Sequence, residues 1–160
     1  MSNIHALVQL LERYAQEELE LQTQTMEALR EQETALFHGD LNAMRKNAER
    51  MDAQLAVCVP RAARRNELLR RFGLHFCVAP STLTLTSICT RLGQDGERLS
   101  QIAAALREAT LSVSRATRRL AALARMHARL NDEILRNVLA DQGVDPKDME
   151  RCGALLDAEV

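Results

Sequence analysis

The fold is decided by residues 99–137, which read LSQIAAALREATLSVSRATRRLAALARMHARLNDEILRN. Side chains with a mostly apolar character recur there at alternating spacings of three and four residues: Leu99, Ile102, Leu106, Ala109, Val113, Ala116, Leu120, Leu123, His127, Leu130, Ile134 and Asn137. A 3.5-residue repeat held over about five heptads is typical of helices that wind around one another. We therefore expect a helix near residues 97–140, roughly 60 Å long at about 1.5 Å per residue.

Two earlier runs show the same periodicity. Residues 3–37 carry apolar side chains seven apart, with Leu11 between the first two: Leu7, Tyr14, Leu21, Ala28 and Ala35. Residues 41–72 follow Asp40, a good N-cap, and repeat at Leu41, Met44, Ala48, Met51, Leu55, Cys58, Ala62, Arg65, Leu69 and Phe72. We expect Leu55 and Leu106 to be buried in the resulting seams. Because Pro60 lacks a backbone donor, we also expect a kink in the second run.

Helix-breaking residues separate these runs. His38-Gly39-Asp40 predicts the turn of an antiparallel hairpin, and residues 73–80 read as the longest loop. Ser81 is the expected cap of a short helix through Leu92, residues 93–96 form a further interruption, and Gly143 with Pro146 ends the last helix.

The predicted fold class is therefore all-α: a long antiparallel helical hairpin, or coiled-coil-like bundle, of three main helices with one short extra helix. We expect a single helical domain over residues 1–140. Residues 141–160 read as an acidic C-terminal tail, either flexible or forming a short helix.

The composition agrees with a folded bundle. Of 160 residues, 46% are hydrophobic and 27% charged, which excludes a disordered chain, and only 2% are aromatic, which favours a bundle over an enzyme pocket. Residues 1–40 carry eight acids against two arginines, whereas residues 97–136 carry eight arginines against four acids. We expect the acidic first helix to lie beside the basic last helix.

The cysteines, the first residues of the sequence and the length of its apolar runs bear on the cellular compartment. Cys58, Cys77, Cys89 and Cys152 form no CxxC pair, so we expect reduced, mostly buried thiols. The start Met-Ser-Asn-Ile-His lacks the features of a signal peptide, and no apolar run approaches the roughly 20 residues that span a bilayer. These features predict a cytoplasmic protein without stable membrane insertion.

The sequence carries no recognised catalytic, metal or cofactor motif. His75-Phe76-Cys77 lacks further ligands for zinc, and His127 occupies a seam position, where a phosphoacceptor would need to face solvent. Arg61, Arg64, Arg65, Arg70 and Arg71 form a basic cluster, but the chain is slightly acidic and carries no nucleic-acid motif. We expect this patch to be solvated or to face a protein partner, and we expect no enzyme activity.

The end of the last helix has more apolar surface than one neighbour needs. At about 100° per residue, its apolar side chains cover an arc of roughly 220°, whereas a helix packed on one neighbour needs about half of that. Either this end packs against two neighbouring helices within the bundle, or it binds a partner helix. For the second case, the predicted partner-binding residues are Leu120, Leu123, Leu130, Ile134, Leu135, Val138 and Leu139.

Two stretches resemble a known family. Ala35-Leu36-Phe37-His38-Gly39-Asp40-Leu41 and the polar-apolar run of residues 130–139 with Asn131 are similar to segments of the FlgN family of flagellar type III export chaperones, and the likeness extends over residues 5–140. The resemblance implies a cytoplasmic chaperone that binds the helical C-terminal regions of hook-associated subunits. Such a chaperone keeps them unpolymerised and delivers them to the export gate or export ATPase complex. The family's substrate contact lies toward its C-terminus, where the wide apolar arc falls.

Two alternatives stay open beside this interpretation. One is a structural coiled-coil scaffold or stalk in a secretion apparatus or other cytoplasmic assembly, which would self-associate with most of its apolar surface covered. The other is a phosphotransfer module or enzyme, which would need a solvent-facing His127. The sequence also leaves open whether the chain forms a homo-oligomer.

Overall fold

A computed structural model describes residues 2–141, with side chains for residues 4–138, and confirms the all-α fold class. No strand occurs among the described residues. The predicted tail, residues 142–160, lies outside them. The elements in chain order are α1 (Ser2–His38), α2 (Leu41–Ala56), α3 (Cys58–Phe76), the 3-10 turn η1 (Pro80–Thr82), α4 (Leu85–Leu92), the 3-10 turn η2 (Gly93–Gly96) and α5 (Glu97–Asp141).

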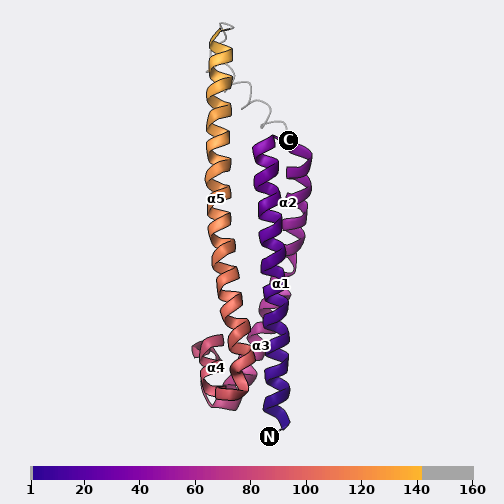
Figure 1. Cartoon of the computed structure of the whole chain (residues 1–160), viewed down its shortest axis with the longest axis vertical. Helices are drawn as coiled ribbons and strands as arrows, with labels where there is room; N and C mark the ends of the chain where they lie inside the picture. The colour runs from indigo at the N-terminus through magenta and orange to yellow at the C-terminus, as the bar shows by residue number, and fades with distance from the viewer. Residues whose placement is uncertain (1, 142–160) are drawn as a thin grey trace, which may run out of the picture. The chain divides into compact units, whose positions relative to one another are not determined.

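The predicted hairpin turn between α1 and α2 is confirmed. Gly39 adopts φ +67°, and the N–H groups of Gly39 and Asp40 donate back to the carbonyls of Leu36 and Ala35, which ends α1 in a Schellman motif. Asp40 then starts α2 by accepting the N–H of Ala43 at 3.0 Å. The two helices lie side by side and antiparallel (Figure 1).

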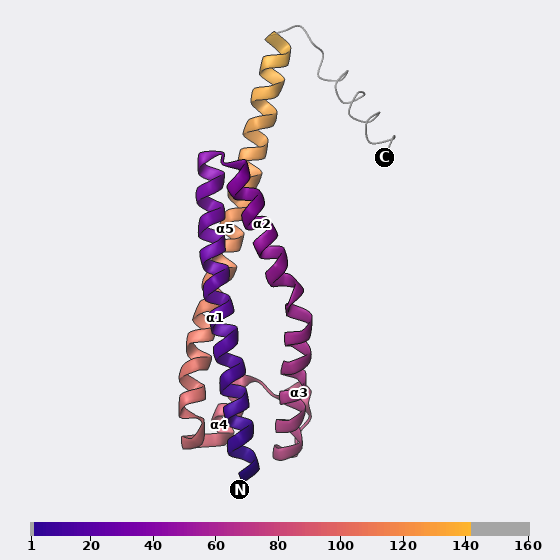
Figure 2. The same ribbon diagram turned by 90° about the vertical axis from the view of Figure 1, so that its right-hand side faces the viewer.

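The predicted interruption near Pro60 is also confirmed. The second run divides into α2 and α3 at Val57, which keeps a helical φ of −86° but a ψ near zero. Pro60 becomes the third residue of α3, where a missing N–H leaves no helical bond unmade. Figure 2 shows the change of direction between the two helices.

The end of α3 differs from the prediction. Residues 73–80 are not one long loop, because α3 continues through Gly73 to Phe76 and ends at Cys77 in the left-handed conformation, φ 54°. Gly73 is buried, and a Cβ there would lie 2.8 Å from the carbonyl oxygen of Val78. The glycine therefore serves the close return of the chain and not the end of the helix.

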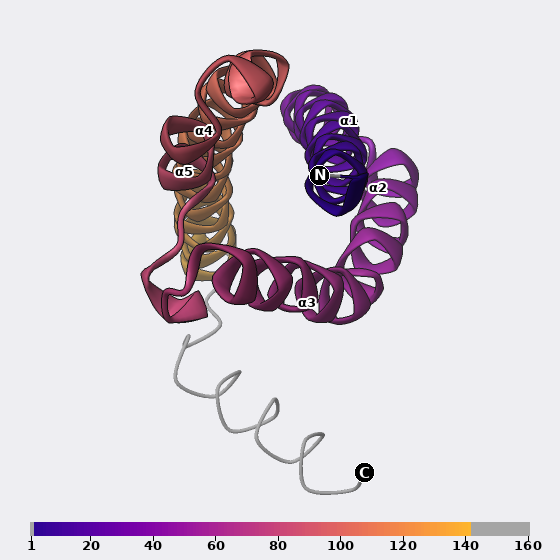
Figure 3. The same cartoon turned by 90° about the horizontal axis from the view of Figure 1, so that it is seen from below.

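The short extra helix exists, but Ser81 does not cap it. Ser81 lies inside η1, and α4 begins after Thr84. Thr84 accepts the N–H of Ser87 at 3.1 Å while the Ser87 hydroxyl accepts the N–H of Thr84 at 2.8 Å, a reciprocal capping box. The view in Figure 3 shows α4 beside the beginning of α5.

The core gathers around the first half of α1. The largest fully buried side chains of the core are Phe72 of α3, Ile88 of α4 and Leu99 of α5. Burying each contributes about 1.5–3 kcal/mol, so this cluster dominates the stability of the bundle. The predicted apolar positions of α1 are confirmed as buried at Leu7, Leu11, Tyr14, Ala28 and Ala35, whereas Leu21 is half-buried. The core cluster adds Val8, Ala15, Leu68 and Leu83.

The predicted seam of residues 41–72 is wrong over most of its length. Leu41 is 76% exposed and Leu55 65% exposed, so neither is a core residue. Ala48, Cys58, Ala62 and Arg65 are exposed as well, and only Phe72 is fully buried. The physical reason is that the polar residues of α2 and α3, among them the buried Asn47, face the polar side of α1. Leu106, the other expected core residue, is half-buried.

The described residues divide into two units on either side of a boundary between Leu120 and Ala121, inside α5. Within the first unit, the expected neighbourhood of the acidic first helix and the basic last helix is confirmed by two ion pairs. Arg98 lies 3.7 Å from Glu12, and Arg119 lies 2.5 Å from Glu33. Both pairs join residues 86 apart, so the chain runs in the same direction in α1 and in this part of α5.

Candidate functional site

The last part of α5 carries exposed apolar side chains along one side. Met126, Leu130, Ile134 and Val138 are four residues apart, and Leu135 lies next to Ile134 in the sequence. All five side chains are between 47% and 60% exposed. Large apolar groups scattered singly on a surface are ordinary, but a contiguous stripe is typical of an interaction site. We call these five residues the α5 stripe.

The predicted partner-binding residues divide between exposed and partly buried positions. Leu130, Ile134, Leu135 and Val138 belong to the α5 stripe. Leu120 and Leu123 are half-buried, and the side chain of Leu139 lies outside the described residues. The binding role of the whole set stays a prediction.

A row of arginines borders the α5 stripe. Arg125, Arg129 and Arg136 are spaced four and seven residues apart, so they share one side of the helix, and all three are exposed. An apolar stripe with a basic border matches an amphipathic helix that carries carboxylates beside its own apolar face.

A second apolar surface lies on α2, and sequence reasoning missed it. The residues assigned above to a buried seam instead form an outer stripe, in which Leu41, Ala48 and Leu55 are exposed and Met44 and Met51 are half-buried. We call these five residues the α2 stripe. The sequence does contain a signal for the side that faces α1, namely two sets of polar residues spaced seven apart. One set is Glu18, Thr25 and Gln32, and the other is Asn47, Gln54 and Arg61; we call these sets the polar heptads.

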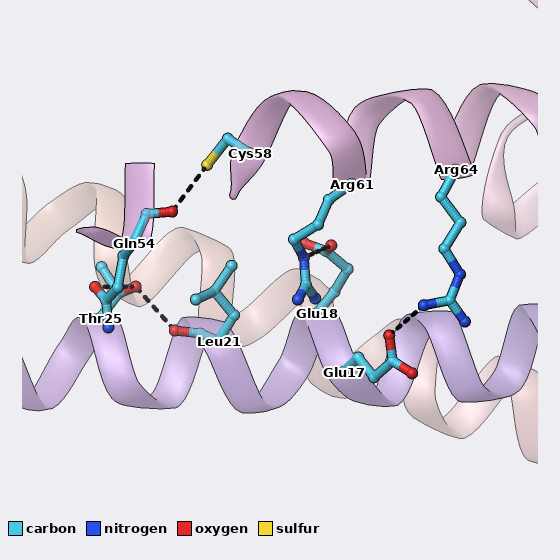
Figure 4. Close-up of polar contacts among 8 residues, drawn as sticks. All are labelled: Glu17, Glu18, Leu21, Thr25, Gln54, Cys58, Arg61 and Arg64. Carbon is cyan, nitrogen blue, oxygen red and sulfur yellow. Dashed lines mark hydrogen bonds and ion pairs between the residues drawn. The ribbon is translucent and has the colours of Figure 1, made fainter. Parts of the chain in front are cut away.

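Two opposing pairs of these polar heptads, Glu18 with Arg61 and Thr25 with Gln54, meet in the hairpin seam (Figure 4). Arg61 donates from Nε to Glu18 at 2.6 Å, and the Thr25 hydroxyl lies 3.5 Å from the Gln54 side-chain oxygen. Each pair of residue numbers adds to 79, and the same antiparallel register sets Gln32 opposite Asn47. The hairpin is thus closed by polar contacts, which leaves the apolar side of α2 turned away from α1.

The basic cluster is largely paired within the chain. Arg61 and Arg64 bind Glu18 and Glu17 of α1, each at 2.6 Å (Figure 4). Arg70 and Arg71 both bind Glu67 at 2.8 Å, and their hydrogen bonds lower the pKa of that carboxyl to about 2. Four of the five arginines therefore neutralise glutamates of the same chain, which leaves little of the patch for an anionic ligand.

A cavity of about 480 Å³ opens beside Tyr14. Its polar lining includes Tyr14, Glu18 and Arg65, while the apolar walls come from Leu11, Leu69, Leu83, Leu85 and Leu106. Burial, followed by the charge of Glu18 and a hydrogen bond to it, raises the pKa of Tyr14 to about 12. The phenol is thus held protonated, which suits a structural role better than that of a general base.

The remaining reactive groups are scattered. Cys58 and Cys77 are exposed free thiols, so the expectation of mostly buried cysteines is wrong for these two, while Cys89 is half-buried and Cys152 lies outside the described residues. Cys77 is exposed because it occupies the left-handed turn that ends α3. His127 is half-buried. Within the described residues, no three His, Cys, Asp or Glu side chains come together as metal ligands.

No membrane-spanning helix within the described residues, and no similar known protein, indicates what these surfaces bind. No helix within residues 2–141 combines the length and apolar character that a bilayer crossing needs. Comparison of the chain with protein-family models, with curated proteins and with solved structures finds no match.

Proposed function

We propose that this chain is a cytoplasmic, non-enzymatic export chaperone. It binds the helical C-terminal regions of flagellar hook-associated subunits and delivers them to the type III export gate or its ATPase complex. The proposal joins the two stretches of sequence that resemble the FlgN family to one structural observation, the exposed α5 stripe. No cofactor or nucleic acid takes part in this role.

The α5 stripe supports helix binding in particular. Its side chains keep about half of their surface open to solvent, which is available apolar area for a partner. A second amphipathic helix fits such a stripe through anchors spaced three or four residues apart. The α5 stripe lies toward the C-terminus, where the FlgN-family resemblance implies the substrate contact.

The arginine border adds a specificity element. Arg125, Arg129 and Arg136 favour a helix with acidic residues beside its apolar face and disfavour a basic one. Charge complementarity of this kind acts mainly on the association rate and weakens as salt screens it. A chaperone that must release its cargo benefits from an interface that is not purely apolar.

A structural coiled-coil scaffold is the second candidate, and the α2 stripe is the observation that favours it. Leu41 and Leu55 are exposed at positions of a heptad repeat, which is the pattern of a helix that pairs laterally. A scaffold would use such a surface to assemble many copies, whereas a chaperone would hold one subunit per chain and release it.

Co-expression with hook-associated subunits of the same organism tests the proposal. We expect a soluble complex with one subunit per chaperone chain, detected by mass, that fails to form when the subunit lacks its C-terminal helix. Truncation elsewhere in the subunit is the matched control and should leave the complex intact. A chain that binds none of these subunits, or that binds the truncated one equally well, would contradict the chaperone role.

A further inference from the structure

The α2 stripe has the pattern of one half of a two-stranded coiled coil. Leu41, Met44, Ala48, Met51 and Leu55 are spaced three, four, three and four residues apart, which are the a and d positions of the heptad. The three a positions are the exposed ones, and the two methionines at d are half-buried. This surface is separate from the α5 stripe and does not depend on the proposed function.

The neighbouring helix α1 does not cover this stripe. Asn47, which is 7% exposed, and Gln54 occupy the g positions of the same heptads, and their side of α2 faces α1. Arg50 also reaches α1, where it pairs with Glu31 at 3.1 Å. One flank of the α2 stripe is therefore closed by α1, and the other flank, the e positions, is open.

The open flank carries two opposite charges. Arg45 and Asp52 are the e positions, seven residues apart, and both are exposed. Neither takes part in an ion pair within the part of the chain that the structure describes. Along α2 the positive charge of Arg45 comes first and the negative charge of Asp52 second. A second copy of α2 that runs in the opposite direction therefore presents a negative charge opposite Arg45 and a positive charge opposite Asp52.

We propose that the α2 stripe binds the α2 stripe of a second copy of this chain, in antiparallel orientation. In antiparallel coiled coils, residues at e face the e positions of the partner helix. Arg45 then meets Asp52 of the second copy, and Asp52 meets its Arg45. Met44 packs against Leu55 of the second copy, and Ala48 against its Met51. A two-fold axis near the middle of α2 makes every contact occur twice, as in a closed dimer.

The charges of the open flank distinguish the two orientations of the pair. A parallel pair would set the e positions of one copy against the g positions of the other. Arg45 and Asp52 would then lie opposite the uncharged Asn47 and Gln54, so a parallel pair forms no ion pair along this flank. An antiparallel pair sets e against e and g against g, so the two open flanks with their opposite charges meet and the two α1 helices lie on the same side of the pair. The charges of the open flank therefore favour the antiparallel arrangement.

Sedimentation equilibrium of the full chain tests the proposal. We expect a concentration-dependent dimer that Arg45→Asp or Asp52→Arg each weakens on the order of tenfold, because one reversal turns two attractive pairs into two repulsive ones. The double variant R45D/D52R should restore the wild-type association. Lys46→Asp makes the same charge change at an exposed position of α2 that belongs to neither the stripe nor its open flank, and serves as the matched control.

A second variant separates the interface from folding. Leu55→Glu should abolish the dimer and leave the thermal midpoint by circular dichroism unchanged at concentrations where the wild type is also monomeric, because Leu55 is largely exposed within one chain. A wild-type chain that stays monomeric at millimolar concentration overturns the proposal, and so does a double variant that fails to recover dimerisation. A monomeric chain whose binding to a different protein is lost in Leu55→Glu also overturns it, since the stripe would then serve that protein. Substitutions in the α5 stripe leave the dimer intact, so this proposal and the chaperone role fail independently.

Discussion

Arg61 of α3 donates from Nε to Glu18 of α1 across a distance of 2.6 Å, and both side chains are three-quarters or more buried. The second guanidinium nitrogen of Arg61, Nη2, is buried without a hydrogen-bond partner in the described part of the chain. The pair therefore lies within the hairpin seam, one heptad from the Thr25–Gln54 contact. Buried polar pairs of this kind contribute more to the choice of register than to stability.

Removing one partner of this pair is expected to cost more than removing both. Glu18→Ala leaves a partly buried guanidinium without its carboxylate and should lower the free energy of unfolding by about 1–2 kcal/mol. The double variant with Arg61→Leu should recover most of that loss, because no charge is then left unpaired. Urea unfolding of the two single variants and the double variant measures the coupling. Additive losses would show that the pair is independent of the seam.

The contrast between two leucines tests where the core lies. Leu99→Ala should lower the free energy of unfolding by about 2–5 kcal/mol, because the side chain is fully buried among α1, α3 and α4. Leu55→Ala should cost less than about 0.5 kcal/mol because most of its side chain meets solvent. Chemical denaturation of both variants decides the point, and equal losses would contradict the placement of the core.

Tyr14 gives a direct optical readout of the cluster around α1. It is the only tyrosine of a chain without tryptophan, so the phenolate absorbance reports this residue alone. We expect its titration midpoint near pH 12 in the folded chain. The folded state keeps a proton that the unfolded state loses near pH 10, so this group's contribution to stability is complete below pH 10 and is lost as the pH rises to 12.

Glu18→Gln is the control for the Tyr14 titration. Removing its charge should lower the pKa of Tyr14 but keep it above the ordinary value of 10, because burial is the larger cause of the shift. Circular dichroism at each pH establishes that the chain is still folded. A midpoint near 10 in a folded wild-type chain would show that Tyr14 is open to solvent.

The sequence periodicity predicts where the helices lie, but it does not predict which side of each helix packs against its neighbours. Gly39 and Asp40 predicted the hairpin turn correctly because the left-handed residue and the N-cap are local features. Pro60 likewise located the break between α2 and α3. Both signals act within one turn of helix, so they do not depend on what packs nearby.

The seam of α2 could not be predicted from its apolar repeat, because the choice of face depends on the neighbouring helix. The α2 stripe is the more apolar side, yet Gln54 and Arg61 meet matching polar groups at Thr25 and Glu18. Gly73 was misread for a related reason, since only the return of Val78 and Pro80 shows why a Cβ is excluded. Long-range contacts decided both cases. For the α5 stripe, periodicity correctly identified apolar excess, but it could not tell internal packing from exposure.

The central claim is that the exposed apolar side of α5 binds a partner helix, and the triple variant Ile134→Gln, Leu135→Gln and Val138→Gln tests it most directly. Calorimetric titration with the C-terminal helix of a hook-associated subunit should show affinity weakened by well over tenfold, because truncating anchors of such an interface often costs about 2 kcal/mol each. The thermal midpoint by circular dichroism should stay nearly unchanged, since all three side chains are about half or more exposed. The matched control, Ala121→Gln, Ala128→Gln and Asp132→Gln, changes exposed positions off the stripe and should bind like the wild type. Full affinity in an intact triple variant would contradict the claim, and so would unfolding of that variant, which would assign the stripe to the core.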